Sequence, residues 1–139
     1  MYRSEELTLI LVVLLALLLA ACGGSPDYLL IGTARAPSAD GTVQVDDIGG
    51  DGGLVTVHME RLPPPRHLGE GNTAYMVWFE ATGKTIKAGE LDYKVTTRTG
   101  DLMKPCPFGT FKLKITAESK PDAERPSDFV IAEQTISFD

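Results

Sequence analysis

Three side chains in this sequence have the chemistry to hold a transition metal. Cys106 is a soft thiol ligand, and His58 and His67 are imidazole ligands, a donor set that suits copper or zinc. Copper sites of the cupredoxin type place a histidine shortly after the cysteine, but no histidine follows Cys106. We therefore expect two solvated histidines, a half-buried free cysteine between two prolines, and no metal site.

A second group that could do chemistry is acidic. Asp46, Asp47 and Asp51 stand beside or among the glycines of 49–53, and carboxylates in such a loop can bind calcium. Their spacing fits neither the EF-hand loop nor the Gly-Gly-x-Gly-x-Asp repeat, in which Leu54 takes the place of the aspartate. The glycine-rich composition instead predicts an acidic hairpin turn.

Catalytic motifs are missing from the sequence. It contains no Gly-x-Ser-x-Gly nucleophile elbow, no phosphate-binding Gly-Lys-Ser/Thr loop and no His-Glu-x-x-His zinc helix. The net charge of −6 provides no basic face for nucleic acid. We expect a protein that is not an enzyme, that binds no cofactor and that has no nucleic-acid partner.

The N-terminal residues carry a stronger signal. Positions 7–21 form an apolar run that only Thr8 interrupts. As a helix this run would span roughly 22 Å, whereas the hydrocarbon core of a bilayer is about 30 Å thick. The run is therefore short for a transmembrane helix and has the length of the apolar region of a signal peptide.

The apolar run ends in Leu19-Ala20-Ala21-Cys22, which resembles the lipobox of bacterial lipoproteins. The resemblance implies a signal peptide over 1–21, cleavage after Ala21, and a lipid anchor on the thiol of Cys22 that attaches the protein to a membrane. Residues 22–27 would then be the lipidated cysteine and a short tether. Five tether residues reach at most about 17 Å, so the domain should sit close to the membrane surface.

Two further residue patterns near the cysteine and at the N-terminus bear on this prediction. Gly23, and no aspartate, follows the cysteine, which by resemblance to enterobacterial sorting implies the outer membrane, with the domain in the periplasm. The n-region has Arg3 against Glu5 and Glu6, although signal peptides usually begin with a positive excess. The alternative is an ordinary secretory peptide that happens to end in cysteine.

The remainder of the chain, 28–139, has the length of one domain. It is a series of short runs, alternating or wholly apolar, that Gly, Pro and Asp separate, and it shows no convincing helical period. The pattern predicts an all-β fold, a single antiparallel β-sandwich of the immunoglobulin-like kind after the signal helix, with a small β-barrel as the alternative. The eight predicted strands are 28–34, 42–48, 54–62, 73–81, 85–94, 97–104, 111–117 and 129–138.

The alternation also predicts which side chains face the core. The odd-numbered residues from Val55 to Met59 should point inward, and so should those from Phe111 to Ala117. Residues 75–79 are continuously apolar and should be covered on both faces of a central strand, with Trp78 as a core anchor.

Several segments of the second half are similar to the extracytoplasmic β-sandwich domain of anti-sigma-K-type factors. The similarity covers roughly 54–139 and implies a non-catalytic module that works outside the cytoplasm. The sigma-binding function of that family is not expected here, because only residues 1–6 precede the apolar run. The segments that carry the resemblance are Tyr75-Met76-Val77-Trp78-Phe79, Ala88-Gly89-Glu90-Leu91, Ile115-Thr116-Ala117-Glu118 and Pro126-Ser127.

These observations predict a lipid-anchored, non-catalytic interaction module of the cell envelope. It would act in assembly or stress sensing by contact with an envelope protein. The alternative is a periplasmic lipoprotein that binds a small ligand or a metal.

Overall fold

The computed structural model describes residues 8, 10, 12, 13, 27–50 and 52–137. The predicted cleavage site at Leu19, Ala20 and Ala21 and the predicted anchor Cys22 lie outside these residues. The four described residues that precede 27 are helical. Within the described part of the chain, no helix is both long enough and apolar enough to span a membrane.

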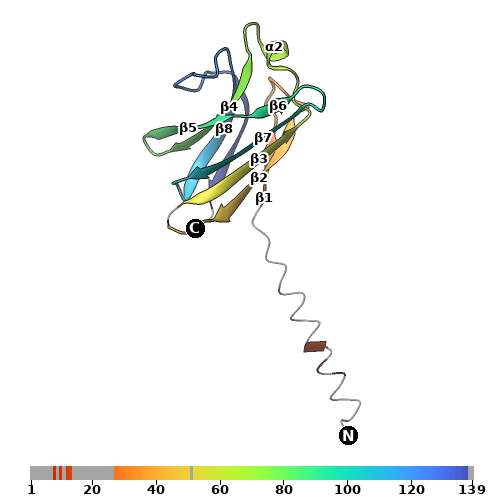
Figure 1. The fold of residues 1–139 in the computed structure, drawn as a ribbon, viewed down its shortest axis with the longest axis vertical. Helices are drawn as coiled ribbons and strands as arrows, with labels where there is room; N and C mark the ends of the chain where they lie inside the picture. The colour runs from red at the N-terminus through yellow and green to blue at the C-terminus, as the bar shows by residue number, and fades with distance from the viewer. Residues whose placement is uncertain (1–7, 9, 11, 14–26, 51, 138–139) are drawn as a thin grey trace.

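Two antiparallel sheets pack face to face, as Figure 1 shows. The first sheet has the order β1-β2-β3-β7-β6, and the second has the order β5-β4-β8-β9. The prediction of a β-sandwich is therefore confirmed, and the alternative of a closed barrel is wrong. The strands are β1 (Asp27–Ile31), β2 (Asp40–Asp47), β3 (Gly53–Glu60), β4 (Ala74–Ala81), β5 (Lys84–Glu90), β6 (Asp92–Lys94), β7 (Thr99–Cys106), β8 (Thr110–Glu118) and β9 (Val130–Ser137), and a short helix, α2 (Pro65–Leu68), follows β3.

The strand order is that of the immunoglobulin fold. Strands β2, β3, β7 and β6 follow the order of the four-stranded immunoglobulin sheet, and β4, β8 and β9 follow that of the facing sheet. Strand β5 extends the second sheet beyond β4, and β1 is an extra strand outside β2. Side-chain alternation predicted two layers, whereas the order of strands within each layer had no signature in the sequence.

One predicted strand was wrong in its extent. Residues 85–94 form two strands, β5 and β6, that belong to different sheets. The chain crosses between the sheets at Leu91, which is 2% exposed and whose N–H donates to the carbonyl of Tyr75 at 2.9 Å. Gly89 adopts a φ of +149°, a conformation that other residues rarely take, and so permits the crossing. The apolar pattern continues through the crossing because Leu91 joins the same core.

The main core lies between the two sheets. In β3 the burial alternates residue by residue, and Val55, Val57 and Met59 are buried as predicted. The odd-numbered residues of β8 from Phe111 to Ala117 are also buried. Burial of each large apolar side chain in this layer contributes roughly 1.5–3 kcal/mol to stability. The layer between the sheets is therefore the principal source of the stability of the fold.

A second, smaller apolar cluster lies on the other face of β4. It contains Ala74, Met76 and Trp78, and Ala123 from the β8–β9 connection packs against it. Residues 74–79 are all buried, which confirms that β4 is covered on both faces and that Trp78 is an anchor, although in this second cluster and not in the main core.

Candidate functional site

The three candidate metal ligands lie far apart in the fold. His58 pairs with Asp101 in the β3–β7 ladder, whereas Cys106 lies five residues farther along, where it pairs with Gly53. Cys106 is buried in the main core, while His58 is on the outer face of the first sheet and His67 is exposed on α2. Among the described residues, no three His, Cys, Asp or Glu side chains are grouped in a way that could hold a metal ion.

The environment of Cys106 keeps its side chain as a thiol. Burial raises the pKa of Cys106 above its usual value, and a backbone hydrogen bond from Phe108 to the sulfur offsets only part of that effect. A neutral thiol is a poor nucleophile, so this cysteine has the character of a core residue. Its almost complete burial exceeds the half-burial that the sequence suggested.

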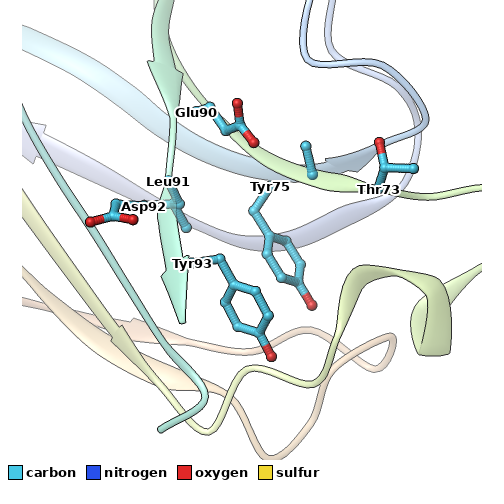
Figure 2. A pocket seen from close by; sticks show the side chains of 7 residues that line it. Thr73, Tyr75, Glu90, Leu91, Asp92 and Tyr93 are labelled. Atoms are coloured by element: carbon cyan, nitrogen blue, oxygen red, sulfur yellow. The ribbon is translucent and has the colours of Figure 1, made fainter. Parts of the chain in front are cut away.

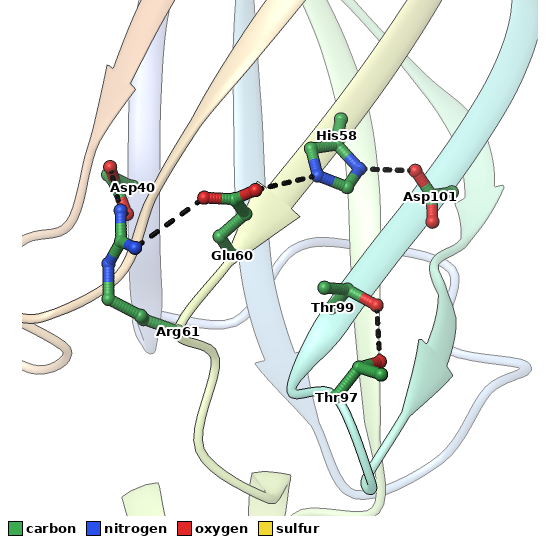
Figure 3. A network of polar contacts seen from close by, with 7 residues as sticks. All are labelled: Asp40, His58, Glu60, Arg61, Thr97, Thr99 and Asp101. Carbon is green, nitrogen blue, oxygen red and sulfur yellow. Dashed lines mark hydrogen bonds and ion pairs between the residues drawn. The ribbon is translucent and has the colours of Figure 1, made fainter.

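His58 belongs to a chain of charged side chains on the outer face of the first sheet (Figure 3). Its Nδ1 lies 2.6 Å from Oδ1 of Asp101, and its Nε2 lies 3.4 Å from Oε1 of Glu60. Arg61 continues the chain by pairing with both Glu60 and Asp40. The hydrogen bond to Asp101 is the main reason that the pKa of His58 is raised. The sequence correctly predicted that this histidine points outward, but it did not indicate which side chains the histidine contacts.

The acidic turn between β2 and β3 is a hairpin connection, as predicted. Gly49 and Gly50 have φ values of +88° and +76°, the conformations for which glycine is suited. The N–H of Gly49 donates to Oδ1 of Asp47 at 2.8 Å, so this carboxylate stabilises the turn. Asp51 lies outside the described residues.

A concave surface lies where the chain crosses from β5 to β6. One hollow is open between β6 and the beginning of β4, as Figure 2 shows. The carboxylate of Glu90 points toward the side of the hollow that holds Thr73 and Tyr75, whereas Asp92 points away from it (Figure 2). The residues that line this hollow are Thr73, Ala74, Tyr75, Glu90, Leu91, Asp92 and Tyr93.

A second hollow adjoins the first, because Thr73 and Tyr93 line both. The second is more apolar, and we call the two together the tyrosine groove. Val95 at its edge is 62% exposed, a high fraction for a large apolar side chain. The residues that line this second hollow are Pro64, Pro65, Arg66, Asn72, Thr73, Tyr93 and Val95.

Two tyrosines fix the shape of the tyrosine groove. The rings of Tyr75 and Tyr93 meet edge to face with their centroids 5.4 Å apart. The hydroxyl of Tyr93 donates to the carbonyl of Leu62 at 2.7 Å, and that of Tyr75 donates to the carbonyl of Pro63. Burial raises the pKa of both tyrosines, so both hydroxyls stay protonated and remain donors. The proline segment is thereby held against β4 and β6 as a stiff wall.

The tyrosine groove lies at the end of the sandwich opposite to the start of β1. Figure 1 shows α2 near one end of the domain, with β6 on the same side, and the start of β1 toward the other end. Sequence reasoning missed this groove, because its two halves come from segments about thirty residues apart. The only available signals were the three successive prolines and the alternation in Leu91-Asp92-Tyr93-Lys94-Val95.

Comparisons of the chain with protein-family models, with curated proteins and with solved structures found no match. The resemblance to anti-sigma-K-type domains stays a prediction. The functional interpretation rests on the tyrosine groove and on the N-terminal sequence.

Proposed function

We propose that this chain is a lipid-anchored, non-catalytic interaction module of the cell envelope that binds a protein partner in the tyrosine groove. Cys22 would hold the domain at a membrane, most simply the outer membrane with the domain in the periplasm. The position of the tyrosine groove carries the proposal. The groove lies at the end of the sandwich opposite to the start of β1 (Figure 1), so a tether that joins the domain there would leave the groove directed away from the lipid surface.

The construction of the tyrosine groove favours binding of a protein. Tyrosine is among the residues that most often dominate protein interfaces, because one rigid ring offers both apolar area and a polar tip. Here the partly exposed ring of Tyr93 is already held by the bond from its hydroxyl to the carbonyl of Leu62 and by its contact with the buried ring of Tyr75, so it does not need to be ordered when a partner arrives. Pre-organisation of this kind lowers the entropic cost of association.

A photocrosslinking experiment in cells tests the proposal. The full-length protein would carry p-benzoylphenylalanine in place of Val95, whose exposure should allow the change without loss of folding. The matched control carries the same group in place of Thr135, which is exposed on β9 of the other sheet. We expect one reproducible protein adduct from position 95 and none from position 135. Equal labelling from the two positions, or adducts to lipid alone, would contradict the proposal.

The lipid anchor has its own test. Replacement of Cys22 by Ala should abolish incorporation of labelled palmitate and leave the precursor unprocessed, because the modified thiol would be absent. A matched Cys106→Ala variant should label normally, since Cys106 is buried in the main core. Palmitate incorporation that persists in Cys22→Ala would show that Cys22 is not the lipid-bearing residue.

A further inference from the structure

We infer that the partner contributes an extended segment that adds as a strand beside β6, with a basic side chain at Glu90, an apolar side chain at Val95 and Tyr93, and an acidic side chain at Arg66. This inference rests on the proposed function and specifies the chemistry of the partner. It combines three properties of the tyrosine groove, namely a free strand edge, an apolar centre and charges of opposite sign at its two ends.

The free strand edge belongs to β6, which is the last strand of its sheet. Among the described strands β6 pairs only with β7, through Asp92, Tyr93 and Lys94. The hollow between β6 and the beginning of β4 lies along the other edge of β6 (Figure 2). An edge strand presents unpaired backbone N–H and C=O groups, and an added strand satisfies them while side-chain pockets select its sequence.

The two ends of the tyrosine groove differ in charge. Glu90 is exposed, directs its carboxylate into the first hollow, and has no ion pair with any described residue (Figure 2). Arg66 is exposed on α2 at the second hollow and likewise has no ion pair within the described part of the chain. Asp92 contributes less to the negative charge of the first hollow, because it points away from the hollow and its Oδ2 lies 4.0 Å from Nζ of Lys94.

The spacing in the partner follows from strand geometry. In an extended segment, side chains at alternate positions point to the same face and are roughly 7 Å apart. We assign to such a segment three alternate side chains, in the order basic, apolar, acidic, that face the tyrosine groove. Such a segment complements Glu90, then the exposed edge at Val95, then Arg66, and the reverse distribution of charge would meet like charges at both ends.

Peptide binding to the full-length protein in detergent micelles tests this order. The probe is a fluorescein-labelled peptide, Gly-Lys-Thr-Leu-Thr-Glu-Gly, and its affinity is measured by fluorescence anisotropy. A second peptide has Glu in place of its Lys, and a third has Ala in place of its Leu. We expect each change to weaken binding by about tenfold, because one removes the charge pair and the other empties the apolar centre.

Substitutions in the protein make the test specific to the groove. The variant Glu90→Lys should reverse the preference, binding the glutamate peptide better than the lysine peptide. The matched control Glu133→Lys, at an exposed position on β9, should preserve the original order. A preference that Glu90→Lys leaves unchanged, or failure of all three peptides to bind, would overturn the inference. The proposed function is judged separately by the adduct from position 95, which does not depend on the sequence of the partner.

Discussion

The outer faces of the two sheets differ in how far their polar side chains are exposed to water. Each face carries polar side chains joined in a chain of hydrogen bonds, but the chain on the first sheet is exposed and the chain on the second is buried. The first joins Asp101, His58, Glu60, Arg61 and Asp40 across β7, β3 and β2 (Figure 3). Its side chains are 41–58% exposed, so water competes for every contact.

The chain on the second sheet begins at Trp78. Its indole N–H donates to the hydroxyl of Thr116 at 2.8 Å, and that hydroxyl donates to Oε1 of Glu118 at 2.7 Å. The same carboxylate oxygen accepts the backbone N–H of Ser127 at 2.7 Å. Thr116 is fully buried and Glu118 is 7% exposed. These contacts hold the β8–β9 connection over the face of β4.

The difference shows how burial sets the value of a polar contact. An exposed ion pair contributes about 0–1 kcal/mol, because solvent screens it and two long side chains must be ordered. A buried donor or acceptor that loses its partner costs about 1–3 kcal/mol, since water cannot replace the lost bond. The hydrogen bonds on the second face should therefore contribute strongly to stability, whereas the ion pairs on the first face should mainly affect the surface charge.

The largest expected effect comes from removing the anchor of the second face. Trp78→Ala should reduce the free energy of unfolding by about 3–5 kcal/mol, because it leaves a cavity beneath the β8–β9 connection and removes the indole donor to the buried Thr116 hydroxyl. Urea unfolding followed by far-ultraviolet circular dichroism measures the change. The matched variant Thr56→Ala, on the outer face of β3, should change stability by less than about 0.5 kcal/mol. Equal losses in the two variants would remove the distinction between the faces.

A smaller effect should follow from Glu118→Ala, which removes the acceptor shared by Thr116 and Ser127. We expect a loss of about 1–3 kcal/mol. The β8–β9 connection should also loosen, which would admit water to Trp78 and shift its fluorescence to longer wavelength. Trp78 is the single tryptophan of the chain, so the emission reports this site alone. Glu133→Ala, at an exposed position on β9, should leave both the stability and the emission unchanged.

The contrast between the faces was only partly readable from the sequence. Strict alternation in β3 and a continuous apolar run in β4 correctly predicted one half-exposed sheet and one strand covered on both sides. The segment that covers the outer face of β4 could not be predicted, because residues 119–129 are rich in proline and charged residues and resemble an ordinary surface loop. Its contacts with Trp78 and Glu118 depend on a long-range register that no local pattern encodes.

The tyrosine groove was hidden for a related reason. Tyr93 was assigned to one long strand, whereas the crossing at Leu91 moves it to the other sheet, where its hydroxyl reaches Leu62. A strand that changes sheets keeps its alternation of apolar and polar residues, so the period cannot reveal the change. Gly89 was the one local sign of the crossing, and glycine also occurs in uninterrupted strands.

The smallest effect that we predict is a pH dependence on the exposed face. His58 faces Asp101 and Glu60, which as carboxylates only accept hydrogen bonds, so only the protonated imidazole can donate to both. The pKa of His58 in the folded protein is therefore raised from 6.5, chiefly by Asp101. The stabilisation from this contact should be complete at pH values below 6.5 and should disappear as the pH rises through the raised pKa.

Comparison of the wild type with His58→Gln between pH 5 and 9 isolates this contribution. The difference in the urea midpoint should favour the wild type most at the acidic end of this range and should shrink as the pH rises. Its maximum should correspond to less than about 1 kcal/mol, because the histidine side chain is 41% exposed and is screened by solvent. His67→Gln, at an exposed position on α2, should show no such trend. A difference that grows with pH would mean that the neutral imidazole is the stabilising form, and the two faces would then differ in mechanism as well as in magnitude.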